Sequence, residues 1–348
     1  MKKLLLSAFV ICLAGTSIAQ ESPLWMRHCA LSPDGTTIAF TYKGDIYTVP
    51  STGGRATQIT TNPAFDTEPV WSPDSKQIAF ASDRMGSLDV FVVSSEGGAP
   101  QRLTTHSGSE KPVAYKDNKH ILFTANIAPS AEDAGFPSGQ FQQVYKVAVT
   151  GGRPAMFSSM PMECISINKE GVMLYQDKKG YEDYWRKHQV SPIARDIWTY
   201  TPGKKPVYQK QTTFGGEDRE PVWSPDGKSF YYLSEEKGSF NIFQHIPGAT
   251  TSQQITFHTK HPVRFLSIST TGTLCYGYDG EIYTLVPGKQ PQKVNISILT
   301  DKNDKDIIRQ IKSNGATDIA VSPKGKEVAF IMRGDVYVTS IDYKTTKQ

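Results

Sequence analysis

The chain has 348 residues and a formal net charge of +4, with 38 basic and 34 acidic side chains. This mild balance favours neither nucleic acid nor an anionic membrane as a partner. An aromatic content of 11%, together with 28 glycines and 22 prolines, is typical of short strands and frequent turns, and long amphipathic helical patterns are absent.

Residues 1–19 have the features of a secretory signal peptide. Lys2 and Lys3 precede an apolar run that ends at Leu13, and small residues lead to a cleavage site after Ala19. The run is too short for a membrane span, and the large residues before Cys12 differ from the small residue of a lipoprotein signal. We therefore expect a periplasmic or secreted mature chain without a membrane span, whose net charge falls from +4 to +2 when both lysines are removed.

Residues 68–104 contain the unit from which the chain is built. Four short β-type runs alternate there with turn signals, first at Pro73-Asp74-Ser75 and later at Glu96-Gly97-Gly98. Proline fixes φ and glycine permits a positive φ, so the residues of both turns suit the backbone conformations that turns require. A single sheet of this size has two apolar faces that it cannot bury alone, and it needs neighbours stacked on both sides.

The same unit recurs along the chain at intervals of 40 to 56 residues, which is the period of propeller blades. The position of Ser72 recurs at Ser32, Tyr115, Asn168, Ser224, Ser269 and Ser322. The third strands read Asp45-Ile46-Tyr47, Asp89-Val90-Phe91, Gln143-Val144-Tyr145, Asp196-Ile197-Trp198, Asn241-Ile242-Phe243, Glu281-Ile282-Tyr283 and Asp335-Val336-Tyr337. We predict an all-β fold in which residues 20–298 form a six-bladed β-propeller of four-stranded blades.

The end of the chain departs from this repeat. Residues 299–315 are strongly charged and have the composition of a linker. Residues 316–348 then supply the first, second and third strands of a seventh unit, without a fourth. We expect an incomplete first blade of a second propeller, in a chain that continues beyond Gln348.

The sequence carries no recognisable catalytic centre. It lacks a GxSxG elbow, an HExxH helix and a glycine-rich phosphate loop, so we predict no catalytic residue, metal or cofactor in this chain. Three cysteines remain in the mature chain, Cys29, Cys164 and Cys275, and we interpret them as buried strand thiols because no CxxC spacing indicates a metal site.

Two groups of polar residues are better explained by turns than by chemistry. Serines at Ser-Pro-Asp and related turns can bond the local backbone, which argues against a role as nucleophiles. The serines in question are Ser32, Ser72, Ser224 and Ser322. We likewise interpret Asp226 with Glu235-Glu236, and Glu217 with Asp218, as solvated turn charges rather than general acid–base pairs.

Two long insertions lie between second and third strands, at residues 126–140 and 177–195. The first is rich in small residues, and we interpret it as a long irregular loop. The second gathers aromatic and basic side chains of the kind found in contact hot spots. The predicted binding residues are Tyr181, Tyr184, Trp185, Arg186, Lys187 and His188. A loop packed on its own propeller remains the alternative.

Loops that precede the first strands should lie on the same face as these insertions, because strands in a blade alternate in direction. These loops are charged, and they could extend the predicted binding face. Their charged residues are Asp66, Glu68, Glu110, Lys111, Glu217, Asp218, Arg219, Glu220, Lys260 and His261.

The Ser-Pro-Asp turns, the Asp-Ile-Tyr-type third strands and the Leu-Thr strand endings resemble the propeller repeats of the TolB and tricorn-protease group. The order of domains, a six-bladed propeller followed directly by the start of another propeller, is similar to that of the tricorn-type serine peptidases. The resemblance implies catalytic residues in C-terminal domains beyond a second propeller, and those positions do not exist in this chain. In that family adjacent arginines hold a peptide carboxylate, but this sequence has no Arg-Arg pair.

The resemblance therefore implies a non-catalytic propeller portion of an exported serine peptidase, which positions or filters peptides and scaffolds the assembly. Its partners would be a peptide or protein and the downstream peptidase domains of the same chain, with homo-oligomerisation left open. The alternative is a stand-alone, TolB-like periplasmic propeller for protein interaction, with no enzyme attached.

Overall fold

The structure is a computed structural model, and it describes residues 23–127, 141–180, 188, 190–299, 312–342 and 346–347. The predicted signal peptide lies outside these residues, as do nearly all of the first insertion and most of the charged linker. The described residues form strands and turns without a helix, which confirms the all-β prediction. Consequently, no helix long and apolar enough to cross a membrane occurs among them.

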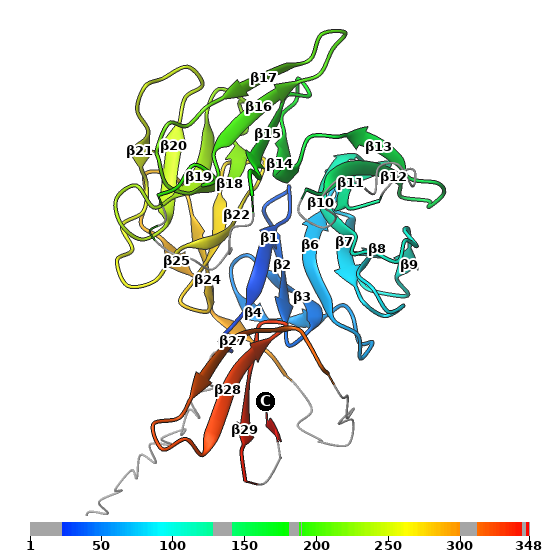
Figure 1. The fold of residues 1–348 in the computed structure, drawn as a ribbon. Helices are drawn as coiled ribbons and strands as arrows, with labels where there is room; N and C mark the ends of the chain where they lie inside the picture. The colour runs from blue at the N-terminus through cyan, green and yellow to red at the C-terminus, as the bar shows by residue number, and fades with distance from the viewer. Residues whose placement is uncertain are drawn as a thin grey trace, which may run out of the picture.

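The described strands form seven four-stranded antiparallel sheets (Figure 1). Each is built from strands that follow one another in the chain, except that β4 (Gly54–Arg55) intervenes in the first sheet. The first three sheets contain β1 (Arg27–Leu31), β2 (Thr37–Tyr42), β3 (Asp45–Pro50) and β5 (Thr57–Gln58); β6 (Asp66–Trp71), β7 (Gln77–Ser82), β8 (Asp89–Ser94) and β9 (Gln101–Arg102); and β10 (Lys111–Asp117), β11 (His120–Ala125), β12 (Gln143–Ala148) and β13 (Ala155–Ser158). The next three contain β14 (Met162–Ile167), β15 (Met173–Asp177), β16 (Ile197–Thr201) and β17 (Val207–Lys210); β18 (Asp218–Trp223), β19 (Phe230–Ser234), β20 (Asn241–His245) and β21 (Gln253–Gln254); and β22 (Arg264–Ile268), β23 (Leu274–Tyr278), β24 (Glu281–Leu285) and β25 (Gln292–Lys293).

The first strands of these six sheets contact one another in succession. β1 contacts β6, β6 contacts β10, and the series continues through β14, β18 and β22, which contacts β1. Apolar side chains fill the space between neighbouring sheets, as where Phe80 and Ile78 pack against Ala39 and Ile46. A hydrogen bond also connects neighbouring sheets, since Trp71 Nε1 donates to Ala30 O of the preceding sheet at 2.9 Å.

A buried threonine explains why the Leu-Thr endings recur together with the third-strand motif. In the second sheet, Thr104 Oγ1 accepts a hydrogen bond from Val90 N at 2.9 Å. Thr60, Thr212 and Thr256 accept from the equivalent third-strand amides, Ile46, Ile197 and Ile242. The threonine satisfies a buried amide that the short fourth strand leaves unpaired.

The Ser-Pro-Asp turns are closed as predicted. Ser72 Oγ donates to Asp74 Oδ1 at 2.7 Å and accepts from Gln77 N at 2.9 Å. Ser224 donates to the exposed Asp226 in the same way, at 2.6 Å. These contacts confirm the turn role of the serines and of Asp226.

Two short strands join the first and sixth sheets. β26 (Ile296–Ser297) pairs in parallel with β4 (Gly54–Arg55). Gly53 makes this approach possible, because it has φ +91° and a Cβ there would lie 2.6 Å from Asn295 O.

The seventh sheet contains β27 (Ala316–Val321), β28 (Glu327–Met332), β29 (Asp335–Ser340) and β30 (Thr346–Lys347), and it lies to one side of the other six (Figure 1). The prediction that this unit has no fourth strand is wrong, since β30 pairs with β29 through Lys347 and Thr346. The sequence does not predict the two-residue strand β30, because no Leu-Thr ending marks it. Ile319 and Val321 are 64% and 62% exposed, so an apolar face of this sheet is uncovered.

Candidate binding site at the seam of the fourth and fifth sheets

The first strand of each of the six sheets contains a β-bulge or similar irregularity, which lies at the same place in every one except β10. In five of them a non-glycine residue there has a positive φ: His28 (48°), Glu68 (55°), Cys164 (51°), Glu220 (51°) and Phe265 (60°). Such backbone conformations cost roughly 1–3 kcal/mol each and occur often near functional sites. The bulges redirect side chains where the six first strands approach one another.

Polar side chains at these bulges interact between sheets. Glu68 forms an ion pair with Lys111 of the third sheet at 2.6 Å. Burial opposes ionisation of this carboxyl, but Lys111 and His28 outweigh it and lower the pKa of Glu68. Burial also lowers the pKa of His28 to about 4, where its ring lies 4.7 Å from the Phe265 ring. His28 is therefore a neutral group at neutral pH.

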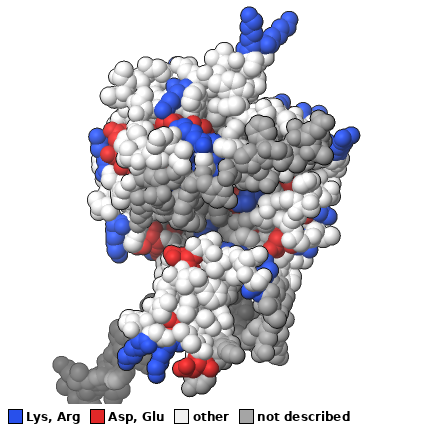
Figure 2. Space-filling view, viewed as in Figure 1, with Lys and Arg blue, Asp and Glu red and all other residues white. Residues whose placement is uncertain are grey.

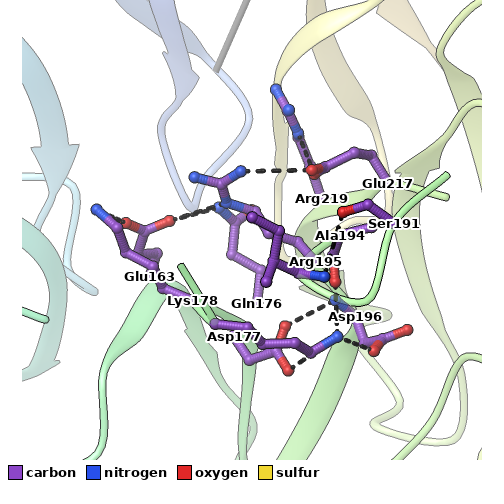
Figure 3. Close-up of polar contacts among 12 residues, drawn as sticks. Glu163, Gln176, Asp177, Lys178, Ser191, Ala194, Arg195, Asp196, Glu217 and Arg219 are labelled. Atoms are coloured by element: carbon purple, nitrogen blue, oxygen red, sulfur yellow. Dashed lines mark hydrogen bonds and ion pairs between the residues drawn. The ribbon is translucent and has the colours of Figure 1, made fainter. Parts of the chain in front are cut away.

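A chain of buried ion pairs spans the seam between the fourth and fifth sheets (Figure 3). Arg195 Nε lies 3.3 Å from Glu163 Oε2, and Arg195 Nη1 lies 3.5 Å from Glu217 Oε1. Glu217 also accepts from Arg219 Nε at 2.9 Å. Glu217 is 1% exposed and both arginines are 3% exposed, so two guanidinium groups share one buried carboxylate. Glu163, at the other end of this chain of ion pairs, also pairs with Lys178, whose Nζ lies 3.4 Å from Glu163 Oε1.

The same seam corrects the prediction for the paired acids. Glu217 and Asp218 are buried rather than solvated, and so is Glu235, whereas Glu236 is exposed as predicted. Burial raises the pKa of Asp218 to about 7. Asp218 begins β18, Glu217 precedes this strand and Glu235 follows β19, so all three lie at strand ends that the surrounding chain buries. The composition of the turns does not show this burial.

The two ends of the 177–195 insertion are fixed to each other. Lys179 Nζ contacts the carboxylate of Asp196 and donates to Ala194 O at 2.6 Å. Asp177 Oδ1 accepts from Asp196 N at 2.8 Å, and its Oδ2 accepts from Trp198 Nε1 at 2.9 Å. Burial raises the pKa of Asp177. The base of the insertion is thus a closed polar clamp beside the Arg195 ion pairs (Figure 3).

One predicted binding residue can be placed. His188 N donates to Glu235 Oε2 of the fifth sheet at 2.5 Å, while its side chain is 63% exposed. The other five, Tyr181, Tyr184, Trp185, Arg186 and Lys187, lie outside the described residues. The insertion of the fourth sheet is therefore held by the fifth sheet at His188.

The charged residues predicted for the loops before the first strands are divided between interior and surface. Asp66 and Glu110 are buried, and Asp66 forms an ion pair with Arg84 at 2.9 Å. His261 faces Asp279 at 3.2 Å on the surface, and Lys260 is exposed. On the face shown in Figure 2, basic and acidic residues are interspersed rather than gathered into one patch. Among the described residues, no group of three His, Cys, Asp or Glu side chains could hold a metal ion.

Sequence reasoning missed Glu163 and Arg195 as members of the site. A glutamate inside the strand sequence Met162-Glu163-Cys164-Ile165 was the available signal, because a charge between apolar strand residues needs a partner when it is buried. Its partner Arg195 lies 32 residues away. The sequence alone does not identify that pairing.

Comparison with known proteins gives a consistent result. The sequence model of the family described as "Tricorn protease N-terminal beta propeller domain" matches residues 23–291. Tricorn protease homolog 1 of Streptomyces coelicolor is 24% identical over 275 residues, and a second tricorn protease homolog of that organism is 22% identical over 335 residues. These alignments cover 76% and 93% of this chain but only 24% and 27% of the two relatives.

The fold is also similar to that of a solved structure. A crystal structure of the tricorn protease superposes with a TM-score of 0.69 at 18% sequence identity. The match covers 93% of this chain and 31% of that one. The chain thus spans about a quarter to a third of the length of these proteins.

Proposed function

Because the chain belongs to the family of tricorn protease N-terminal β-propeller domains, we propose that it is the non-catalytic propeller portion of an exported tricorn-like serine peptidase. In this role it positions or filters peptides and scaffolds the assembly, while downstream domains carry out hydrolysis. The observation that supports a binding role best is the buried Arg195–Glu217–Arg219 arrangement next to the clamped insertion. It fixes the base of a loop rich in aromatic and basic residues.

We propose that residues 20–298 form one six-bladed ring, that residues 299–315 link it to a second propeller, and that residues 316–348 begin that propeller. The succession of contacts from β1 through β22 and back to β1 supports the ring. The exposed Ile319 and Val321 support the second propeller, because a following blade would cover them. Export rests on the signal-like residues 1–19.

The proposed ligand is a peptide that contacts residues 181–188. Arg186 and Lys187 supply positive charge, and three aromatic residues supply the large contact area that hot spots use. An acidic or carboxylate-bearing peptide fits this composition best. His188 anchors the loop to the neighbouring sheet at Glu235, which limits the entropy lost when a peptide binds.

The test measures fluorescence anisotropy of labelled casein-digest peptides with the mature chain and two double variants. Replacing Arg186 and Lys187 by alanine should weaken binding by about tenfold or more, because hot-spot contacts contribute more than about 1 kcal/mol. Replacing the exposed Lys204 and Lys205 is the matched control, since they carry the same charge at the opposite end of the same sheet. Equal binding by both variants would contradict the proposed site.

Mass spectrometry of the same peptides tests the non-catalytic assignment. The peptide masses should be unchanged after incubation, because the sequence has no GxSxG elbow and no HExxH helix to supply a catalytic centre. New cleavage products that persist through repurification and disappear on a point substitution would contradict it. That result would leave the binding measurement intact, so the two parts of the proposal can fail separately.

A further inference from the structure

Two buried cysteines lie together where the first and sixth sheets meet. Cys29 on β1 is 3% exposed, and Cys275 on β23 is completely buried. Both belong to one apolar cluster with Met26 and Ile282, and their thiol groups interact. The third cysteine of the mature chain, Cys164, is on β14 of the fourth sheet and is partly exposed.

Strand geometry brings the two thiols to the same place. Cys29 Sγ donates to Phe265 O of β22 at 3.4 Å, and Leu31 N donates to Ser267 Oγ at 3.0 Å, so β1 lies along β22. Ser267 is opposite Cys275 in the β22–β23 register. β1 also contacts β23 directly. Cys29 therefore faces Cys275 across the junction between two sheets that are far apart in sequence.

We propose that Cys29 and Cys275 form a disulfide under oxidising conditions, as a covalent clasp between the first and sixth sheets. Both cysteines are free thiols in this structure. The clasp would add to non-covalent contacts at the same junction, where Thr270 N donates to Pro33 O at 2.8 Å and β26 pairs with β4. It would enclose nearly all of the six sheets in one covalent loop. A crosslink restricts the unfolded chain more when the loop that it closes is longer.

Glutathione disulfide can supply the oxidising equivalents. One cysteine thiolate attacks a sulfur of glutathione disulfide and releases one glutathione, and the second cysteine thiolate then displaces the other glutathione. A sulfur–sulfur bond forms in the protein, one is lost in glutathione, and the two thiol protons end on the two released glutathiones. Burial raises the pKa of the Cys29 thiol, so the exchange should be slow in the folded chain and fast during refolding.

The experiment refolds the mature chain, residues 20–348, with and without glutathione disulfide. The product is then denatured, alkylated with iodoacetamide, digested and analysed by mass spectrometry. We expect a crosslinked pair of peptides containing Cys29 and Cys275, with Cys164 alkylated. The melting temperature of the oxidised chain should be higher by on the order of 5 °C and should return to the reduced value with dithiothreitol.

Variants identify the thiols involved. Cys164→Ala should retain the crosslink and the shift in melting temperature, whereas Cys275→Ala should abolish both. If Cys275→Ala does not fold, the peptide map of the unmodified chain still decides the question. Alkylation of all three cysteines after oxidative refolding, or a crosslink that includes Cys164, would overturn the proposal.

Discussion

Charged side chains at the seam of the fourth and fifth sheets are buried, and burial of a charge is unfavourable unless partners compensate for lost hydration. Glu217 is compensated by Arg195 and Arg219. Burial lowers the pKa of Arg195, but Glu163 and Glu217 outweigh this and raise it. Removal of one member would leave the others uncompensated, with a typical cost of about 3–5 kcal/mol. Such a network holds the base of the insertion in one arrangement.

Asp218 should make the stability of the fold depend on pH. Its pKa is about 7 in the folded chain, above the ordinary value of 3.8, because burial disfavours the charged form. Between these values the unfolded chain releases a proton that the folded chain retains, so stability falls as pH rises from about 4 to 7. Denaturant unfolding should show that Asp218→Asn removes a slope of up to about 1.4 kcal/mol per pH unit.

Asp226→Asn is the control for this measurement, because Asp226 lies in the same sheet but is exposed, and its hydrogen bond from Ser224 lowers its pKa. That variant should follow the unmodified chain between pH 4 and 7. An unchanged slope in Asp218→Asn would show that Asp218 is ionised in the folded chain throughout this range.

At the scale of the element, the repeat was predictable because its contacts are local. Ser72 and Asp74 are two residues apart, and Thr104 meets Val90 across one hairpin, so sequence spacing reports both contacts. The seam could not be predicted in this way. Its partners come from different sheets and its charged residues occupy positions that look like solvated turns, so only the packing of complete sheets brings them together.

Thr104→Val should destabilise the chain, because valine has nearly the same shape but cannot accept the hydrogen bond from the buried Val90 amide. An unsatisfied buried amide costs about 1–3 kcal/mol, and chemical denaturation should show a loss of that size. Thr105→Val provides the matched control at the neighbouring exposed position. A loss of equal size in both variants would mean that the hydrogen bond is not responsible.

The part of the chain that the structure describes forms six mutually packed four-stranded sheets, the short β4–β26 pair and a seventh four-stranded sheet with an uncovered apolar face. Exposed side chains such as Ile319 and Val321 contribute little to stability until another surface covers them. The sequence predicts a separate unit at residues 316–348 from the break in the repeat at residues 299–315. It did not predict β30, because a strand of two residues carries no periodic pattern.

Limited proteolysis tests the division directly. A protease should trim the chain to near residue 300 and leave a stable core, since the seventh sheet packs against fewer neighbours than the other six. Intact mass measurement and the melting temperature of the core would report this result. Protection through Gln348 would contradict it and would indicate a seventh blade integrated with the others.

The central claim is that residues 177–195 form a binding loop rather than a cover for the propeller, and Trp185→Ala tests it most directly. Peptide anisotropy and the melting temperature are measured on the same variant, with Trp25→Ala as an exposed tryptophan control from the first sheet's edge. The binding account predicts weaker peptide binding, an unchanged melting temperature and a control that behaves like the unmodified chain. A melting temperature lowered by several degrees, with peptide binding intact, would contradict it.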